Sequence, residues 1–530
     1  YYAERWELFK HKYMLAARAW SRGIRRLEEW NEPDLNAPCI NATTWPDYLT
    51  IQGAAVASAY ADLNGDVAAG LAPCPAVLGS CPIEPLLAAS AFANASFYGL
   101  GQVSMQNRNS PTPFGPVPGV TSNFAAYSMH SYGKTGRQLY STVSGLMQNN
   151  VPGLPFWVTE HQSHTNADWN SYGTTADDPW EASRLASQMM NLVQAGAEGY
   201  VFKFSALPSV QGGVTKSGIF FGELSQPPFL VGDSTRSAEA ARLIARAFAG
   251  GKPMEGATLN SSLSNLLAAS SSNDGAYRHL VIVNDGATIS PTAPFASGEN
   301  NVSVSVNLSP WGADISLAVI TTVSESSYAT STLCVGCSGT LTIPVPPWST
   351  VAVRAPAVSG SAVSVETPSA DASVCGGTNA GSNLGLATTL PVGASTTADH
   401  SGTCAAVLQF SGIPGGNRLL TAALTLTVSG APESDTILTV LAAPPGTAIN
   451  EASLTWTSAS FAVIGPDISV PLTAVALNPV GLVPNASVAG HVSVLAGQTG
   501  QVTVDVTDAA RSCAPACVFT VARRLRRSLY

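Results

Sequence analysis

The chain is poor in charge. Asp, Glu, Lys and Arg make up only 11% of its 530 residues, and the formal net charge is −9. Basic residues cluster only at 523–527, so no basic surface for nucleic acid extends along the sequence. No run approaches the roughly 18 consecutive apolar residues of a membrane span, and no cysteine has the His-bearing spacing of a zinc site. These absences argue against nucleic-acid-binding, membrane-spanning and zinc-finger proteins.

Cysteines and glycosylation sequons are the features that indicate a cellular location. Nine cysteines lie in Gly-, Pro- and Ser-rich surroundings, which suits disulfides of an oxidising compartment. The candidate pairs are Cys74/Cys81, Cys334/Cys337, Cys513/Cys517 and Cys375/Cys404, with Cys39 left over. Six Asn-x-Ser/Thr sequons occur, at Asn41, Asn94, Asn260, Asn301, Asn307 and Asn485. We therefore predict a secreted glycoprotein of the cell wall or cell surface.

The first 250 residues alternate between helical and strand-like patterns. An amphipathic helix opens the chain, because Trp6, Phe9, Tyr13 and Trp20 recur at three- and four-residue steps. The expected helices are 2–20, 45–61, 137–148, 179–195 and 237–248, and the expected strands are 24–30, 67–71, 125–132, 155–160 and 200–205. Strands that alternate with helices over such a length predict a parallel α/β sheet.

After residue 250 the helical signal disappears and Val, Thr and Ser alternate. Residues 251–357 predict an accessory antiparallel β-sandwich, and 358–530 predict a second β-sandwich or jelly roll. The strands expected in the first are 279–284, 302–308, 314–322, 339–345 and 349–354, and those in the second are 405–410, 420–428, 436–442, 490–494, 502–506 and 517–522. A chain this long exceeds the roughly 250 to 300 residues over which one core keeps growing, so several domains are expected.

Two glutamates follow strand-like segments and are candidates for catalysis. Glu32 comes just after the strand at 24–30, and Glu160 ends the strand at 155–160. Glycoside hydrolysis needs a carboxylic acid to protonate the departing oxygen and a carboxylate on the opposite side, about 5 to 5.5 Å away in retaining enzymes. Asn31 can hydrogen-bond a sugar hydroxyl beside Glu32. Glu28 and Glu29 precede this motif. Because successive side chains of a strand point to opposite faces, one of the two should point away from the site.

The segments 30–34, Trp-Asn-Glu-Pro-Asp, and 157–160, Trp-Val-Thr-Glu, resemble the strand-4 and strand-7 motifs of clan A glycoside hydrolases, and family 39 in particular. The resemblance covers residues 1–250. It implies a (β/α)8 TIM barrel, with Glu32 as acid/base, Glu160 as nucleophile and Asn31 as a contact to the sugar 2-hydroxyl. His130 and Tyr132 match the end of strand 6, where the clan contacts the nucleophile or the sugar. No cofactor is implied.

The match to the clan has two gaps. The strand at 200–205 offers Phe202-Lys203-Phe204 where many members place a Trp. The chain also opens on what corresponds to the third barrel helix, so strands 4 to 8 are present and the first three are absent from it. We expect a further N-terminal segment or another polypeptide to complete the barrel.

Residues 363–525 resemble secreted DNRLRE-type β-sandwich modules, some of which bind polysaccharide. For this module, sugar binding and a purely structural role stay open as equal alternatives. The whole chain is predicted to be a secreted retaining glycosidase that cleaves a cell-wall or extracellular-matrix polysaccharide. The main alternative is a non-catalytic matrix or cell-surface glycoprotein that uses the barrel as a scaffold or for binding sugar. A metal-dependent hydrolase using His130, His161 and His164 lacks a ligand-spaced pair on a helix.

Overall fold

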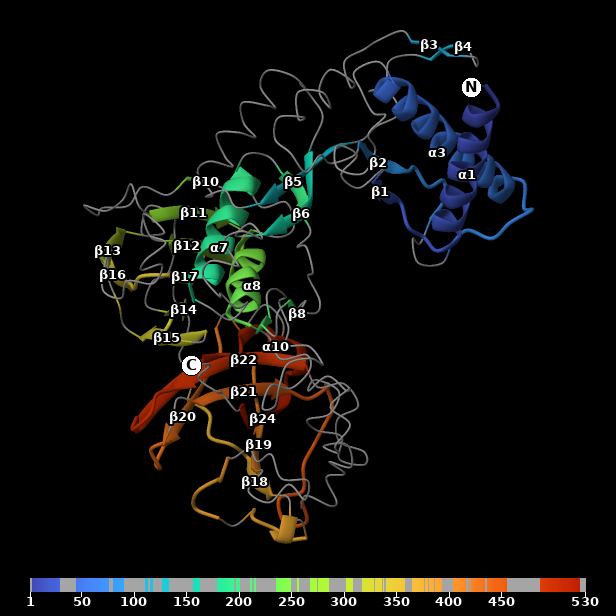
Figure 1. Cartoon of the computed structure of the whole chain (residues 1–530). Helices are drawn as coiled ribbons and strands as arrows, with labels where there is room; N and C mark the ends of the chain where they lie inside the picture. The colour runs from blue at the N-terminus through green and yellow to red at the C-terminus, as the bar shows by residue number, and fades with distance from the viewer. Residues whose placement is uncertain are drawn as a thin grey trace. The chain divides into compact units, whose positions relative to one another are not determined.

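In the computed structural model of the chain, the residues described are 2–28, 44–75, 80–89, 110–112, 115–117, 126–132, 156–162, 179–194, 197–200, 210–211, 214–215, 235–248, 255–256, 267–273, 275–285, 302–307, 317–327, 329–335, 337, 340–357, 365–375, 377–379, 381–385, 387–392, 404–415, 419, 421–433, 436–454 and 487–524. Most of the regular structure is β-strand, with few helices (Figure 1). The chain forms two compact units, Tyr1–Thr165 with Asn191–Lys203, and Asn166–Met190 with Phe204–Tyr530.

The first unit contains a parallel sheet whose strand order follows the sequence. Its strands, in spatial order, are β1 (Arg26–Glu28), β2 (Leu86–Ala89), β5 (Ala126–Tyr132), β6 (Phe156–Gln162) and β7 (Ala197–Tyr200). All four neighbouring pairs are parallel. The other elements are helices α1 (Tyr2–Ser21) and α3 (Thr44–Ala68) and the hairpin β3 (Ser110–Thr112) and β4 (Gly115–Val117). The predicted parallel α/β sheet is present, and over the described residues it is open rather than closed.

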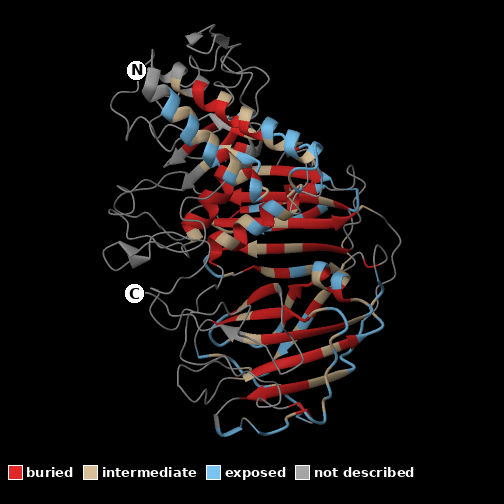
Figure 2. Cartoon of the chain, turned by 90° about the vertical axis from the view of Figure 1, so that its right-hand side faces the viewer, coloured by how far each residue is buried: buried red, intermediate tan, exposed pale blue. Residues whose placement is uncertain are grey.

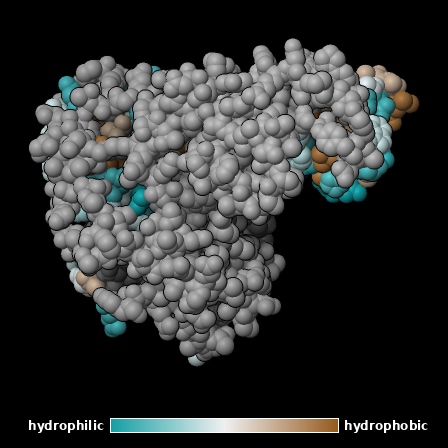
Figure 3. Space-filling view, turned by 45° about the horizontal axis from the view of Figure 1, so that its top comes forward, coloured by the Kyte–Doolittle hydropathy of each residue, from teal (hydrophilic) through white to brown (hydrophobic). Residues whose placement is uncertain are grey.

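Helix α1 forms where the aromatic spacing predicted it. Trp6 stacks on Phe9 and Phe9 on Tyr13, with ring centroids 5.7 and 6.4 Å apart, because residues three and four apart share a helix face. Tyr13 Oη donates to Asp62 Oδ2 of α3 at 2.9 Å. Trp6 remains 46% exposed, and Figure 3 shows hydrophobic atoms beside hydrophilic ones on the surface of the two helices.

The strand expected at 67–71 is wrong: α3 runs through Ala68, and the second strand is β2. Gly70 ends this helix with φ 72°, a left-handed conformation that costs glycine little. The N–H of Gly70 bonds the carbonyl of Val67 at 3.0 Å and that of Leu71 bonds Asp66 at 2.8 Å, the pattern of a Schellman cap. The strand was predicted from the apolar character of 67–71 alone. The alanine-rich sequence before Gly70 favours a helix instead.

The second unit is built mainly from antiparallel sheets. An eight-stranded sheet has the order β10 (Glu255–Gly256), β11 (Leu267–Asn273), β12 (Tyr277–Asn284), β17 (Ser349–Pro356), β14 (Leu317–Val323), β15 (Thr330–Val335), β23 (Gly500–Asp505) and β20 (Ala423–Val428). A five-stranded sheet has the order β18 (Ala370–Cys375), β19 (Cys404–Ser411), β24 (Ala516–Arg524), β21 (Thr436–Ala442) and β22 (Ser487–Val494). The remaining strands pair as β13 (Val302–Asn307) with β16 (Thr340–Val345), and β8 (Val210–Gln211) with β9 (Val214–Thr215). The helices are α7 (Pro179–Gln194), which begins in this unit, α8 (Arg236–Phe248), α10 (Thr507–Cys513) and the 3-10 turn η5 (Gly377–Asn379).

The described residues of this unit include two large hydrophobic cores. One gathers residues of β11 to β17 around Ile282, Val304 and Ile343, and the other gathers β19 to β24 around Val440 and Phe519. Figure 2 shows the strands of the unit coloured mostly as buried. A single sheet passes from one core to the other, because β15 pairs with β23. The sequence boundary at 357/358 therefore separates two cores that share a sheet.

The strands predicted after residue 250 match observed strands within a few residues, whereas β10, β11, β15 and β18 were missed. Of these, β11 and β15 carry Ser- and Thr-rich sequences, Leu267–Asn273 and Thr330–Val335, without a strict apolar alternation. Helices α7 and α8 begin and end within one residue of the predicted limits. The helix expected at 137–148 lies outside the described residues.

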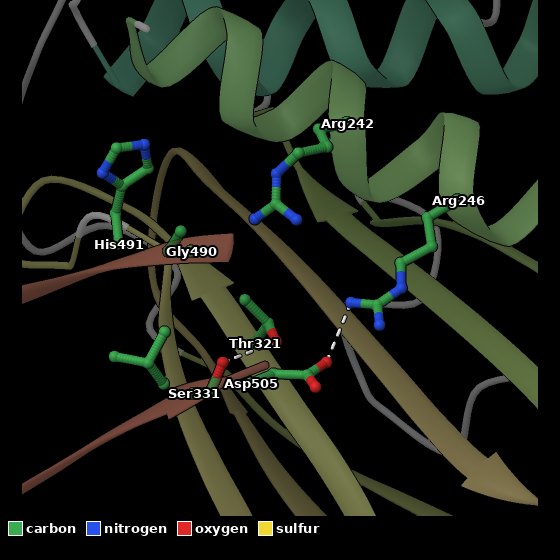
Figure 4. Close-up of a pocket in the computed structure, with 9 residues that line it drawn as sticks. Arg242, Arg246, Thr321, Ser331, Gly490, His491 and Asp505 are labelled. Atoms are coloured by element: carbon green, nitrogen blue, oxygen red, sulfur yellow. Dashed lines mark hydrogen bonds and ion pairs between the residues drawn. The ribbon is translucent and has the colours of Figure 1, made fainter. Parts of the chain in front are cut away.

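Helix α8 contacts strands of the first core through an apolar stripe and carries charged residues toward the second. Leu243 packs with Val323 and Ala329, and Ala240, Ile244 and Ala247 are buried at the same helical spacing. Figure 4 shows Arg242 and Arg246 reaching from this helix toward Asp505 of β23, beside a small polar cavity that His491 of β22 also lines.

Asp505 is the centre of this buried charge cluster. Its side chain is 5% exposed and binds Arg354 of β17 through both oxygens at 2.9 Å and Arg246 of α8 at 2.8 Å. Thr507 adds a backbone N–H at 3.0 Å and a hydroxyl at 2.7 Å. A buried carboxylate needs such donors because leaving it unpaired costs several kcal/mol. The cluster therefore joins α8, β17 and the start of α10.

Two buried tyrosines have strongly shifted pKa values. Tyr60 of α3 donates its hydroxyl to the carbonyl of Ile24, which ties the helix to the segment leading into β1. Burial raises the pKa of Tyr60 to about 12. Tyr277 of β12 lies under the guanidinium groups of Arg354 and Arg511, at 4.8 and 4.9 Å from the ring centroid, and burial raises its pKa to about 12 as well.

Replacing Asp505 is expected to destabilise the second unit strongly. Asp505→Ala removes the buried carboxylate partner of the 7% exposed Arg354 and leaves it the 3.3 Å contact to the exposed Asp508, which should cost about 3 to 5 kcal/mol of unfolding free energy. The matched control is Glu7→Gln, because the Glu7–Lys10 pair is exposed and is worth at most about 0.5 kcal/mol. Denaturant unfolding of both variants measures the difference, and equal losses would contradict the account of the cluster.

The two tyrosines should also weaken the fold at high pH. Their folded-state pKa values lie above the ordinary 10.0, so their contribution to stability is complete below pH 10 and is lost as pH rises toward 12. Ultraviolet titration should show one late-ionising phenol fewer in Tyr60→Phe than in the wild type. An ordinary titration midpoint for the Tyr60 phenol would show that it is not buried in solution.

Candidate active site at the carboxyl ends of the parallel strands

The first candidate carboxylate follows the edge strand β1. This strand ends at Glu28, and the predicted acid/base Glu32 and its neighbour Asn31 come directly afterwards in the sequence. Both residues lie outside the described residues, so their roles stay predictions. Carboxyl ends of parallel strands are where βα barrels carry their active sites.

The second candidate carboxylate is in register with the predicted strand-6 histidine. Glu160 of β6 pairs with His130 of β5, and Gln162 pairs with Tyr132. His130 is only 1% exposed. The side chains of Glu160 and Tyr132 lie outside the described part. The parallel sheet thus brings the backbones of Glu160 and His130 side by side, as their positions at strand ends predicted.

A register shift precedes this pair. Met129 pairs with Val158, but His130 pairs with Glu160, so Thr159 and Glu160 together oppose a single residue of β5. Such a bulge changes the direction of side chains locally, and bulges are frequent next to active sites. In an unshifted ladder Thr159 would oppose His130, and Glu160 would belong to the other face of the sheet. No glycine or proline marks the bulge in the sequence, so no local signal predicts it.

One carboxylate of β1 reaches both of these strands. Glu28 Oε1 accepts a hydrogen bond from Ser128 Oγ of β5 at 2.7 Å and another from Thr159 Oγ1 of β6 at 2.7 Å. Ser128 is fully buried, Thr159 is half-buried and Glu28 itself is exposed. From the sequence, Glu28 is only one of two consecutive glutamates that alternate in direction along the strand. A period-two pattern, Ser128-x-His130, marks Ser128 as sharing the face of His130.

The contact of Glu28 with Thr159 shows that the sheet is strongly curved. β2 and β5 lie between β1 and β6, so in a flat sheet the two strands would be about 14 Å apart, three spacings of about 4.8 Å. A glutamate side chain is much shorter than that. The face that carries Glu28, Ser128 and Thr159 must therefore be concave, as the inner face of a barrel is.

Apolar residues lie on the same face nearer the amino ends of the strands. Ala126 and Trp157 are buried together, and Leu86 packs against them. The guanidinium of Arg26 lies 5.6 Å from the Trp157 ring centroid, a cation–π contact. Polarity thus increases toward the carboxyl ends, from Trp157 to Thr159 and from Ala126 to His130. The polar end of this face is the end at which the candidate site is predicted.

The cysteines expected to pair are joined by four disulfides, Cys74–Cys81, Cys334–Cys337, Cys375–Cys404 and Cys513–Cys517. Of the sequons, Asn307 lies exposed on β13, while Asn41, Asn94, Asn260, Asn301 and Asn485 lie outside the described residues, as does Cys39. Within the residues that the structure places, no group of three or more His, Cys, Asp or Glu could hold a metal ion. No helix of that part has the length and apolar character needed to cross a membrane.

Comparison with known proteins finds similarity only among solved structures, since no family model and no curated protein matches the chain. A family 30 endoxylanase from Clostridium papyrosolvens C71 aligns over 67% of this chain and 72% of its own, at 12% identity and a TM-score of 0.43. The family 39 enzyme from Xanthomonas axonopodis pv. citri aligns over 67% and 73%, at 13% identity and a TM-score of 0.40. A β-porphyranase of family 86 from Bacteroides plebeius aligns over 96% and 82%, at 12% identity and a TM-score of 0.39. All three are named as glycoside hydrolases.

Proposed function

We propose that the chain is a secreted retaining glycoside hydrolase whose first 250 residues belong to a (β/α)8 barrel of clan A, similar to family 39. The observation that carries the proposal is the curved parallel sheet whose concave face bears Glu28, Ser128 and Thr159, with Glu160 in register with the buried His130. The Asn31-Glu32 pair follows the edge strand of that same sheet. Two carboxylates that a curved sheet brings near each other at strand ends are what double displacement needs.

In the proposed reaction, the Glu160 carboxylate attacks the anomeric carbon while Glu32 protonates the departing oxygen. Glu32 then removes a proton from water, which hydrolyses the glycosyl-enzyme and releases Glu160. Asn31 would bind the sugar 2-hydroxyl, and His130 and Tyr132 would contact the nucleophile or the sugar. The mechanism requires no cofactor.

The proposed substrate is a polysaccharide of a cell wall or extracellular matrix. A secreted location is supported by four disulfides, which form and persist in oxidising compartments. The exposed sequon at Asn307 is accessible to glycosylation. The C-terminal sandwich is proposed to be a DNRLRE-type module. An appended module of this kind suits an enzyme that acts on an insoluble polysaccharide.

Removing either carboxylate should impair turnover in a different way. With the complete secreted protein and a panel of aryl glycosides, Glu160→Ala should lower kcat on the order of 10⁶-fold, the scale of loss when a covalent nucleophile is removed. Glu32→Ala should spare formation of the glycosyl-enzyme from substrates whose leaving group needs no proton, but its hydrolysis should slow because the base that activates water is lost as well. Azide should rescue both, giving a glycosyl azide of inverted configuration with Glu160→Ala and of retained configuration with Glu32→Ala.

The control is Glu84→Gln, because Glu84 is an exposed carboxylate ahead of β2. Its activity should equal that of the wild type. Wild-type protein that binds polysaccharide but turns over no glycoside would refute the hydrolase and support the non-catalytic scaffold. Turnover that survives both Glu32→Ala and Glu160→Ala would refute the assignment of the two carboxylates.

A further inference from the structure

We infer that Glu28 is a positioning residue that holds the β6 bulge and thereby keeps Glu160 in register with His130. The inference rests on the proposed function in that it concerns the same strand ends. Glu28 is not placed in contact with substrate. Its role follows from the two hydroxyl groups that share its Oε1 atom, those of Ser128 and Thr159.

A shared acceptor fixes the separation of its donors. Both hydroxyl oxygens lie 2.7 Å from the same atom, so they cannot be further apart than twice that distance. Ser128 precedes His130 by two residues on the same face, and Thr159 is the residue immediately before Glu160. Glu28 therefore holds β5 and β6 together just before His130 and Glu160, two residues of these strands that the proposed reaction uses.

The contact between Glu28 and Thr159 matters because Thr159 belongs to the bulge. In a regular ladder the residue after Val158 would oppose His130, and that residue is Thr159. Glu160 would then oppose Ser131 and belong to the opposite face, because successive residues alternate between the faces of a sheet. With Thr159 held by Glu28, the extra residue stays in β6, and Glu160 is the partner of His130. Hydrogen bonds to an ionised carboxylate are about twice as strong as neutral ones, which suits a holding contact.

The test separates the hydroxyl contact from the charge. Thr159→Val keeps the shape of the side chain and removes its donor. Glu28→Ala removes the acceptor, whereas Glu28→Gln keeps an acceptor oxygen and removes the charge. We expect Thr159→Val and Glu28→Ala each to lower kcat about 100-fold, the scale of an ångström misplacement, with KM changed less than about threefold. Glu28→Gln should retain most of the activity, and the double variant should be no worse than the poorer single variant, because the two residues act through one contact.

A second experiment uses a variant that lacks Glu160, the residue that Glu28 is proposed to position. In the Glu160→Ala background, azide rescue should proceed at the same rate with and without Glu28→Ala, since no carboxylate remains there to be held. An additional loss there, or additive losses in the double variant, would show that Glu28 supports the strand ends in general and would overturn the positioning role. Glu84→Ala is the matched control for removing a carboxylate.

A readout without turnover keeps the inference distinguishable from the proposed function. Hydrogen–deuterium exchange of peptides spanning 156–162 should become faster in Thr159→Val and Glu28→Ala and stay unchanged in Glu84→Ala. A wild type without turnover whose β6 exchange responds in this way would refute the hydrolase and leave the bulge-holding contact supported. An active wild type in which the two variants change neither kcat nor exchange would refute the role of Glu28 and leave the hydrolase standing.

Discussion

A carboxylate taken out of water must be surrounded by donors, and the second unit is organised around one that meets this demand. Asp505 binds Arg354, Arg246 and Thr507, which come from three different elements. Those partners fix where α8 lies on the eight-stranded sheet and where the chain turns into α10. The hydrophobic cores supply most of the buried area, but their contacts are non-directional, so it is the ion pairs that specify this arrangement.

The first unit uses the same chemistry in a more accessible place. The Glu28 carboxylate accepts hydrogen bonds from two hydroxyl groups, and the residue remains exposed. A hydroxyl donor is short, so it requires a close approach of the strands that carry it. This requirement is met only because the sheet curves. Curvature in turn brings the carboxyl ends of non-adjacent strands near one another, which is the condition for a reaction that needs two separated groups on one substrate.

The sequence predicted those parts of the fold that repeat with a period. The three- and four-residue spacing located α1, α7 and α8, and the strand ends at His130 and Glu160 were correctly expected on neighbouring parallel strands. It failed where a short apolar run has no period, as at 67–71, where a helix ends. The bulge at Thr159 and the contact of Glu28 with β5 and β6 depend on how distant strands meet, and no local pattern encodes that.

The shared sheet bears on the role of the C-terminal sandwich, which the sequence left open between sugar binding and support. A module that searches for its ligand on a tether needs a linker with few contacts across it. Here β15 pairs with β23, Arg246 and Arg354 bind Asp505, and His491 approaches Glu239 to 3.3 Å, so residues from both cores meet in one buried region. Phe410, one of the few aromatic side chains of this sandwich, packs edge-on against Phe519 in the core and is not available for stacking on a sugar. The contacts therefore favour a rigid support continuous with the preceding sandwich, and any sugar that it binds would be held at a fixed position relative to α8.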